Sequence, residues 1–249
     1  MSGGERMSCR VTRITDFTDR VRRFFVLPDA PFPFRAGQHV ALKAGSGSAA
    51  AESPFSICSS PDARELEFYG SFQGDGPVAA AFRALGEGDV LELGPAEGNM
   101  TLDPEADRHL FIATVTGAGP FLSMIREAEA EAEAAGGGRK MTLIHGCRRS
   151  GELGEYLAEL TDLADRASWF RYIPTVSRPQ DDAGWTGETG RATEVLSRRL
   201  TEHDLTPGKS ATYVCGNPEA VVETAAVLGR AGIPSGALHM EEYLRGLLT

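Results

Sequence analysis

The stretch ATVTGAGPFLSMIR, residues 113–126, decides the fold of the second half of the chain. It follows an apolar run at residues 110–113 that predicts a buried strand, and it leads into a pattern that predicts a helix over residues 121–135. Pro120 stands at the first position of that helix, where the missing N–H costs little. The small residues between strand and helix form either a plain turn or a loop that lets phosphate approach the helix N-terminus.

Strand and helix patterns alternate from this stretch to the end of the chain. We expect further buried strands at residues 141–145, 169–176 and 211–215. We expect further helices at residues 152–165, 192–200 and 219–231, the last with Pro218 before it and Gly232 at its C-terminal cap. Such alternation predicts a doubly wound parallel sheet, whose ligands bind outside the carboxyl ends of the strands.

The first part of the chain has a different pattern, in which short β-rich runs alternate with turn signals. We expect strands at residues 11–14, 22–26, 39–43, 65–69 and 90–93, and a further strand within 53–61. Residues 45–51, GSGSAAA, predict a loop, and residues 78–85 a short helix after Gly76 and Pro77. The pattern predicts a small antiparallel β-barrel over residues 1–104, followed after the polar segment DPEADR by an α/β domain over residues 105–249.

The composition argues against several classes of protein. The formal net charge of −10 disfavours nucleic acid as a partner. The four cysteines form no Cys-x-x-Cys pair, so we expect no metal or iron–sulfur site, and any single-electron reaction would need a separate carrier. Residues 1–10 lack the apolar region of a secretory signal, and no apolar run approaches the roughly 18 residues that span a bilayer. We therefore expect a cytoplasmic protein without a membrane span, and a monomer.

Two segments of the barrel half, FRAGQHVAL at residues 34–42 and SPFSICSSP at 53–61, resemble the ferredoxin–NADP⁺ reductase superfamily, especially its compact bacterial members. The family carries Arg-x-Tyr-Ser in a strand that cradles FAD. The resemblance implies that Ser56 bonds near the reactive N5 of the flavin and that Phe55 keeps an aromatic face without a hydroxyl. Ser53 stands where the family has the arginine that grips the pyrophosphate.

The segments LEFYG, residues 66–70, and GDGPV, residues 74–78, resemble the next strand and the pyrophosphate-binding turn of the same family. A glycine-rich turn that opens a helix presents backbone N–H groups to phosphate. The family has serine or threonine at the position of Ala79, so one further hydrogen bond is missing here. Taken alone, Gly-Asp-Gly-Pro would be an ordinary tight turn.

In the second half, residues 113–126 resemble the Gly-Thr-Gly-x-x-Pro-Phe nicotinamide loop of the family. Val115 replaces the first glycine. The matching positions are Thr116, Gly117, Gly119 and Pro120.

Three arginines, Arg148, Arg178 and Arg191, each follow a strand or open a helix, so all three can point to one sheet edge. In bacterial family members, arginines in matching segments bind the 2′-phosphate of NADP, a task that suits the planar guanidinium fork. Ser177 would add a hydroxyl donor. The alternative for each arginine is an ordinary solvated side chain.

The turn CGNP, residues 215–218, resembles a family turn whose thiol lies near the nicotinamide C4. The segment HMEEYL, residues 239–244, resembles the family's C-terminal ending, whose aromatic residues cover the flavin. That likeness gives Tyr243 a stacking role and places Glu242, or Glu241, near the reacting atoms; Leu244 replaces the usual tryptophan.

The resemblance implies a reductase that transfers hydride between NADP(H) and FAD and single electrons to or from ferredoxin or flavodoxin. It implies Ser56, Cys215 and Glu242 as catalytic residues. It implies as cofactor-binding residues Ser53, Pro54, Phe55, Ser56, Phe68, Tyr69, Gly76, Pro77, Val78, Ala79, Thr116, Gly117, Gly119, Pro120, Arg148, Ser177, Arg178, Arg191, Cys215, Asn217, Pro218 and Tyr243. The departures leave two alternatives open: a free-flavin reductase, or a non-catalytic nucleotide-binding subunit with a degenerate flavin site.

Overall fold

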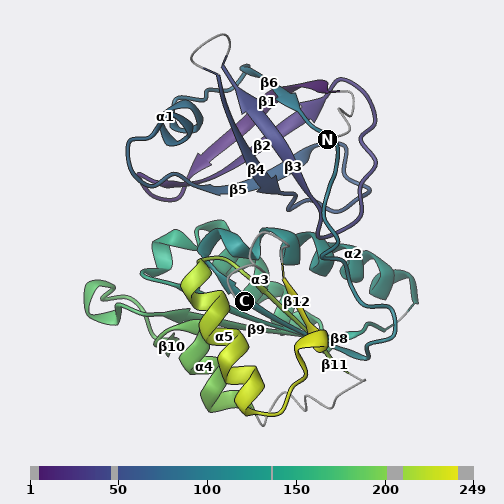
Figure 1. The fold of residues 1–249 in the computed structure, drawn as a ribbon, viewed down its shortest axis with the longest axis vertical. Coiled ribbons are helices and arrows are strands. Elements are labelled where there is room, and N and C mark those ends of the chain that lie inside the picture. Colours follow the sequence, from purple (N-terminus) through teal and green to yellow (C-terminus); the bar gives the residue numbers. More distant parts are fainter. Residues whose placement is uncertain (1–5, 46–49, 136, 201–209, 241–249) are drawn as a thin grey trace. The chain divides into compact units, whose positions relative to one another are not determined.

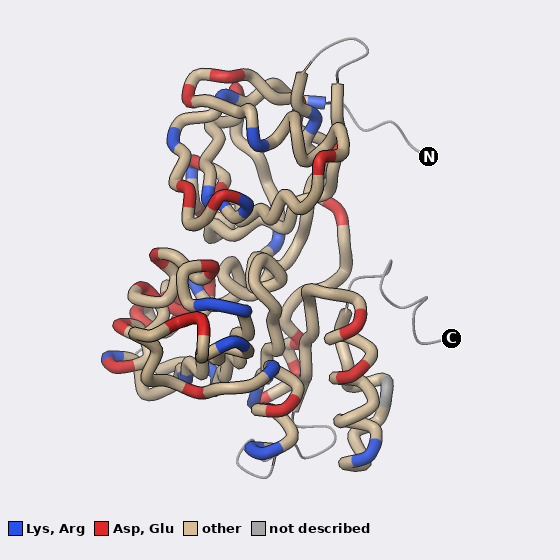
Figure 2. The backbone as a smooth tube through the Cα atoms, turned by 90° about the vertical axis from the view of Figure 1, so that its left-hand side faces the viewer, with Lys and Arg blue, Asp and Glu red and all other residues tan. Residues whose placement is uncertain are grey.

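The computed structural model describes residues 6–45, 50–135, 137–200 and 210–240 (Figure 1). Its elements form two compact units. The first contains the described residues up to Thr101 together with Gly119–Glu127, and the second contains Leu102–Ala118 together with the described residues from Ala128 onward. Charged residues of both signs are spread over both units (Figure 2). Within the described ranges, no helix is long and apolar enough to cross a membrane.

The first unit contains a six-stranded antiparallel sheet in the order β4-β3-β6-β1-β2-β5. Its strands are β1 (Met7–Asp16), β2 (Val21–Pro28), β3 (His39–Ala44), β4 (Ala51–Ser56), β5 (Leu66–Ser71) and β6 (Val90–Leu93). An isolated bridge between Ile57 and Phe68 joins the two edges, so the sheet nearly closes on itself. The expected antiparallel barrel is confirmed.

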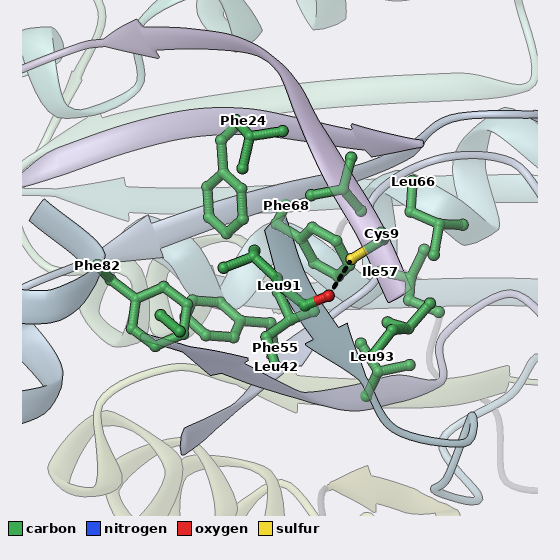
Figure 3. Packing of buried hydrophobic residues seen from close by; sticks show 14 of the residues in the cluster. Cys9, Phe24, Leu42, Phe55, Ile57, Leu66, Phe68, Phe82, Leu91 and Leu93 are labelled. Carbon is green, nitrogen blue, oxygen red and sulfur yellow. Dashed lines mark hydrogen bonds between the residues drawn. The ribbon is translucent and has the colours of Figure 1, made fainter. Parts of the chain in front are cut away.

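The interior of this barrel is filled mainly by phenylalanine and aliphatic side chains (Figure 3). The short helix α1 (Pro77–Arg83) contributes Phe82, whose ring centroid lies 4.8 Å from that of Phe55 on β4. Phe24 meets Phe55 edge-on at 5.7 Å, a favoured geometry for aromatic pairs. Each buried phenylalanine contributes about 1.5–3 kcal/mol relative to an exposed one, so this cluster is a main source of the barrel's stability.

The second unit contains a six-stranded parallel sheet in the order β10-β9-β8-β7-β11-β12. Its strands are β7 (Arg108–Thr114), β8 (Lys140–Cys147), β9 (Phe170–Val176), β10 (Glu188–Thr189), β11 (Ser210–Cys215) and β12 (Leu238–Met240). The helices that connect them are α2 (Gly119–Ala135), α3 (Glu155–Arg166), α4 (Ala192–Arg199) and α5 (Pro218–Arg230). The expected doubly wound parallel sheet is confirmed.

Helices α4 and α5 lie side by side on one face of this sheet (Figure 1). Their buried residues, among them Val195 and Val221, pack on Ile112, Ile144 and Val214 of the central strands. Strands β8, β9 and β10 follow β7 on one side, whereas β11 and β12 lie on its other side. The chain therefore reverses its direction across the sheet between β7 and β11, and such a switch point is where ligands of open α/β sheets bind.

Several expected elements differ from those observed. The expected loop at residues 45–51 ends earlier, because Ala51 already pairs with Ala44 as the first residue of β4. The expected helix at 152–165 is preceded by a 3₁₀ turn at Ser150–Glu152, and its α-helical part begins at Glu155. The short strands β10 and β12 were not expected, because two or three residues carry no readable alternation.

Candidate functional site

The loop between β7 and α2 lies at the switch point of the parallel sheet. It forms a 3₁₀ turn, Val115–Ala118, before α2 begins at Gly119. Gly117 has no room for a side chain: an added Cβ would lie 2.3 Å from the carbonyl oxygen of Cys215. The loop and the end of β11 are thus in direct backbone contact, and two of the predicted site residues, Gly117 and Cys215, lie together.

A second close approach joins the end of β7 to the turn after β11. Gly216 has a φ of 135°, and an added Cβ there would lie 2.0 Å from Oγ1 of Thr114. The same Oγ1 accepts a hydrogen bond of 2.8 Å from the backbone N–H of Asn217. Glycine is therefore required at position 216, both for its backbone conformation and for the space.

The other residues of the CGNP turn have visible structural roles. The side-chain oxygen of Asn217 accepts a hydrogen bond of 2.9 Å from the N–H of Glu219 and so caps α5, whose first residue is Pro218. Cys215 is 6% exposed at the end of β11. A thiol at this position lies at the carboxyl edge of the sheet, and its place beside the nicotinamide C4 stays a prediction.

Arg148 and Arg178 lie together at the carboxyl ends of β8 and β9. The backbone N–H of Arg178 donates to the carbonyl oxygen of Arg148 at 3.1 Å. Both residues are exposed, and within the described ranges their guanidinium groups have no hydrogen-bond or ion-pair partner. Ser177 follows the last residue of β9, and its hydroxyl donates to the carbonyl oxygen of Cys147, the last residue of β8, at 3.1 Å. The pair thus offers two positive charges at one sheet edge.

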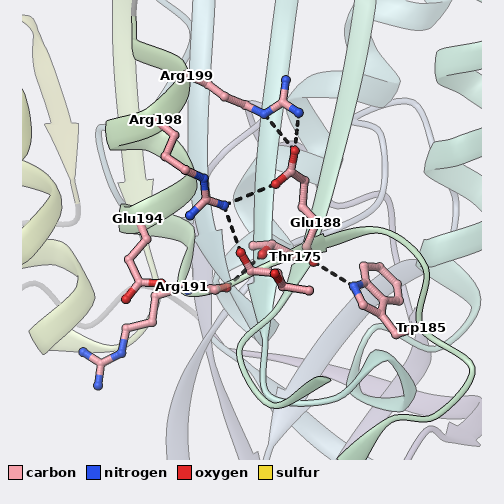
Figure 4. A network of polar contacts seen from close by, with 9 residues as sticks. Thr175, Trp185, Glu188, Arg191, Glu194, Arg198 and Arg199 are labelled. Atoms are coloured by element: carbon pink, nitrogen blue, oxygen red, sulfur yellow. Dashed lines mark hydrogen bonds and ion pairs between the residues drawn. The ribbon is translucent and has the colours of Figure 1, made fainter. Parts of the chain in front are cut away.

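Arg191, the third predicted arginine, has a partner of its own. It precedes α4 as the N-cap residue, and its Nη1 lies 3.1 Å from Oε1 of Glu223 on α5. Figure 4 shows its side chain pointing away from the neighbouring cluster of Glu188, Arg198 and Arg199. A phosphate would have to compete with the carboxylate of Glu223 for this guanidinium.

The cluster in Figure 4 ties the segment before α4, which includes Trp185 and Glu188, to α4 and to β9. The carboxylate of Glu188 binds both Arg198, at 3.2 Å, and Arg199. The pKa of Glu188 is lowered, and the largest cause is its hydrogen bond with Arg199. Trp185 donates its indole N–H to the carbonyl oxygen of Glu188 at 2.7 Å, and Thr175 on β9 donates to that of Gly190 at 2.8 Å.

On the barrel strand β4, the predicted flavin residues lie on two sides. Phe55 is 8% exposed, and its ring is surrounded by the core rings in Figure 3. Pro54 is exposed, whereas Ser53 and Ser56 are half-buried. On β5, Phe68 is fully buried in the same core, and Tyr69 is 5% exposed with its ring 5.8 Å from that of Phe17. The aromatic face expected of Phe55 is therefore covered by other rings in this structure, and its contact with a flavin stays a prediction.

The turn before α1 has an open backbone. Gly74 has a φ of 72°, which favours glycine, and Gly76 precedes Pro77 in an extended conformation. A Cβ added at Gly76 would meet nothing within 4 Å. Val78 is 36% exposed, whereas Ala79 is 6% exposed and packs into the barrel core. The side chain of Ala79 thus serves the core, while the N–H groups of this first turn have no intrahelical acceptor.

The start of α2 packs on the end of β4 within the first unit. A Cβ added at Gly119 would lie 3.1 Å from Cβ of Ser56 and 3.4 Å from Sγ of Cys58. One turn later, the hydroxyl of Ser123 donates to the carbonyl oxygen of Ser59 at 2.7 Å. The predicted residues Ser56 and Gly119 therefore lie side by side, and Pro120 follows Gly119 in the sequence.

A buried ion network, which the sequence analysis did not find, fixes this contact. Arg126 on α2 donates to the carbonyl oxygen of Cys58 at 2.8 Å and to Oε2 of Glu67 on β5 at 2.7 Å. The other carboxylate oxygen of Glu67 lies 2.9 Å from Nε of Arg23 on β2. The side chain of Glu67 is only 4% exposed. Glu67 itself, an acidic residue inside the otherwise apolar segment LEFYG, is the signal from which sequence reasoning could have found this network.

All four cysteines are buried thiols. Burial raises the pKa of Cys9 and of Cys147 to about 12 and that of Cys58 still further, so these three are not reactive thiolates. The described residues contain no group of three or more metal-ligating side chains. Glu241, Glu242, Tyr243 and Leu244 lie outside the described residues.

A family model described as an oxidoreductase NAD-binding domain matches residues 111–226. The flavodoxin/ferredoxin–NADP reductase of Escherichia coli (strain K12) is 29% identical over 223 residues, which are 86% of this chain and 86% of that protein. The reductase component DmpP of phenol 2-monooxygenase from Pseudomonas sp. (strain CF600) is 28% identical over 240 residues, 94% of this chain. The chain spans 64% of the length of DmpP.

Among solved structures, a ferredoxin NADP⁺ reductase from Neisseria gonorrhoeae with bound FAD and NADP matches with a TM-score of 0.82 at 25% identity. The match covers 96% of this chain and 98% of that one. The cytochrome P450 reductase GcoB of Amycolatopsis matches with a TM-score of 0.81 at 23% identity, over 96% of this chain and 70% of that one. The second likeness shows the fold alone.

Proposed function

The chain belongs to the ferredoxin–NADP⁺ reductase superfamily of oxidoreductases, and from this premise we propose that it transfers hydride between NADP(H) and FAD and passes single electrons to or from ferredoxin or flavodoxin. FAD, when bound, exchanges hydride at its N5 and can give up the two electrons one at a time. The observation that carries the proposal is the backbone contact of Gly117 with Cys215 at the switch point of the sheet. We assign FAD binding to residues 1–104 and NADP(H) binding to residues 105–249.

The residues of the second unit fit a dinucleotide. The loop from Thr116 to Pro120 joins a strand to the N-terminus of the 17-residue helix α2, which attracts a pyrophosphate. The guanidinium groups of Arg148 and Arg178, which have no partner within the described part of the chain, can supply the charge that a 2′-phosphate requires. Cys215, at the end of β11, would lie beside the nicotinamide ring. These features favour NADP(H) over NAD(H).

The residues of the first unit fit FAD with fewer contacts than the family pattern provides. Ser56 is half-buried and can offer its hydroxyl to the flavin, and the turn at residues 76–78 can offer backbone N–H groups to the pyrophosphate. Ser53 carries no charge, and Ala79 points into the core. We therefore propose that FAD binds here, and less tightly than an arginine at position 53 would allow.

An absorption spectrum tests the proposal. The purified protein, incubated with FAD and desalted, should show flavin bands that NADPH bleaches in the absence of oxygen. Ferredoxin or flavodoxin added next should restore the oxidised bands. A protein that binds no added FAD, or whose flavin NADPH does not reduce, would contradict the proposed function. Size-exclusion chromatography of the same sample tests the expectation of a monomer.

The absence of a charged group at Ser53 favours one second candidate, a free-flavin reductase that binds flavin as a substrate. Two measurements separate the candidates: the dissociation constant of FAD, and the rate of NADPH oxidation with added riboflavin or FMN compared with ferredoxin. Micromolar or tighter FAD binding together with faster ferredoxin reduction supports the resident-cofactor proposal. Weak binding of all flavins with rapid turnover of free flavin supports the alternative.

A further inference from the structure

Val115 adopts a backbone conformation that valine rarely takes. Its φ is 45°, and it is the one non-glycine residue with a positive φ in the part of the chain that the structure describes. A β-branched side chain in this region is strained, and such strain persists only where surrounding contacts maintain it. Val115 stands where the family pattern has glycine, which adopts a positive φ without strain. Some neighbouring group must therefore hold this residue in place.

The side chain of His145 contacts Val115 directly. His145 lies on β8, between Ala113 of β7 and Pro174 of β9, and is fully buried. Its Nε2 lies 2.8 Å from the carbonyl oxygen of Val115, and its Nδ1 lies 3.2 Å from the hydroxyl of Tyr172. The imidazole thus connects the strained loop residue to the neighbouring strand β9.

The two partners determine the tautomer of this imidazole. A carbonyl oxygen can only accept, so Nε2 must carry the hydrogen and donate it to Val115. In a neutral ring Nδ1 is then the acceptor, and the hydroxyl of Tyr172 donates to it. Burial lowers the pKa of His145 to about 4, so the neutral ring prevails at neutral pH. In this tautomer each ring nitrogen of His145 has a hydrogen-bond partner.

We propose that His145, supported by Tyr172, is a positioning residue for the nucleotide: it holds Val115 in its left-handed conformation and so keeps the loop in the shape that packs Gly117 against Cys215. The proposal rests on the proposed function, in which this loop binds NADP(H). A histidine that merely filled the core would have no need to bind the single strained residue of the loop. Here the strained carbonyl and the buried donor meet at 2.8 Å.

Calorimetric titration with NADP⁺ tests the proposal in two backgrounds, Val115 and Val115→Gly. In the Val115 background, His145→Leu should weaken NADP⁺ binding about fivefold or more, because one buried hydrogen bond is worth about 1 kcal/mol. His145→Gln, whose amide can donate to the same carbonyl, should restore most of the affinity. In the glycine background His145→Leu should cost less than about twofold, because glycine takes the conformation unaided.

His109→Leu is the matched control, since His109 is also buried in this sheet beside a tyrosine hydroxyl but does not contact the loop. It should leave the affinity for NADP⁺ within about twofold of the wild type. All of these variants should also leave the affinity for FAD within about twofold of the wild type. An equal loss from His145→Leu in both backgrounds would overturn the proposal while leaving the proposed function intact. Failure of the wild type to bind NADP⁺ would overturn both.

A nuclear magnetic resonance spectrum of the imidazole gives a readout that needs no cofactor. At pH 7 His145 should be a neutral ring with hydrogen on Nε2; a neutral ring with hydrogen on Nδ1 would overturn the proposal, because Nε2 could then not donate to the carbonyl oxygen of Val115. If His145→Leu does not fold, Tyr172→Phe takes its place in the titration. It should weaken NADP⁺ binding with Val115 present and have no effect with glycine, and equal losses in both backgrounds would again count against the proposal.

Discussion

The proposed phosphate contacts depend on single side chains. Arg148 and Arg178 lie side by side, and their guanidinium groups have no partner among the residues that the structure describes, whereas Arg191 is 3.1 Å from the carboxylate of Glu223. A 2′-phosphate can bind the first two without breaking a pair with any described residue. We therefore expect Arg148 and Arg178 to contribute more to the choice of NADP(H) than Arg191 does, although the sequence pattern ranks the three equally.

Arg178→Ala should raise KM for NADPH about tenfold or more and leave KM for NADH nearly unchanged, because a charge-assisted bond to phosphate contributes about 1.5–3 kcal/mol. Steady-state kinetics with both coenzymes measure the effect. Arg230→Ala is the control, because Arg230 lies at the end of α5 opposite the CGNP turn, and it should change neither value. An equal rise for both coenzymes would show that Arg178 does not contact the 2′-phosphate.

Ser53→Arg should tighten FAD binding about tenfold or more, because it returns a charged group to the pyrophosphate. Ser53 is half-buried, so a longer side chain can extend toward solvent with its guanidinium free. Calorimetric titration with FAD measures the affinity. Ser53→Gln, of similar length but uncharged, should gain little. If wild type and Ser53→Arg bind FAD equally, another residue already holds the pyrophosphate.

At the scale of elements, the long periodic segments could be predicted from the sequence and the contacts that join them could not. The 17-residue helix α2 and the buried strands β7 and β8 carry clear patterns, so their positions were predicted within a few residues. The two-residue strand β10 carries none. Glu67 and Arg126 are 59 positions apart, and local patterns say nothing about such a pair.

The same limit applies to the candidate site. The turns at Gly117, Gly119 and CGNP could be predicted because turns and helix starts depend on local residue types, whereas their role in a site was implied only by the resemblance to the family. The roles of Phe55 and Ala79 could not be predicted, because the direction of a side chain depends on which rings it meets inside the barrel. The pairing of Arg191 with Glu223 depends on how α4 packs beside α5.

The contact between α2 and the barrel strands should depend on the buried ion network. Arg126→Ala removes one of the arginines that the buried carboxylate of Glu67 contacts, and breaking a buried pair by removing one partner costs about 3 kcal/mol. Urea unfolding measures the loss of free energy. Arg64→Ala, at an exposed position on the same barrel, is the control and should change stability by less than about 0.5 kcal/mol. A loss below about 1 kcal/mol for Arg126→Ala would mean that solvent screens this pair.

At the scale of the whole molecule, two buried histidines link stability to pH. Burial lowers the pKa of both His109 and His145 to about 4, from an ordinary value of 6.5. Below pH 6.5 these histidines bind protons in the unfolded chain but not in the folded chain. Their contribution to the free energy of unfolding is therefore fully present above pH 6.5 and is lost as the pH decreases toward 4. Glu92 and Glu188, whose pKa values are lowered by Lys43 and Arg199, reduce stability only below their ordinary value of 4.5.

The interval between pH 6.5 and 4.5 therefore reports on the histidines. We expect the free energy of unfolding to decrease by about 2 kcal/mol for each buried histidine across this interval, since one pKa unit corresponds to 1.36 kcal/mol. Urea unfolding at pH 7, 6 and 5 measures the slope, and His109→Leu or His145→Leu should each remove about half of it. His39→Leu, which alters a half-buried histidine of the barrel, should leave most of the slope in place. A stability that stays constant from pH 7 to pH 5 would show that both histidines reach water or take up a proton in the folded protein.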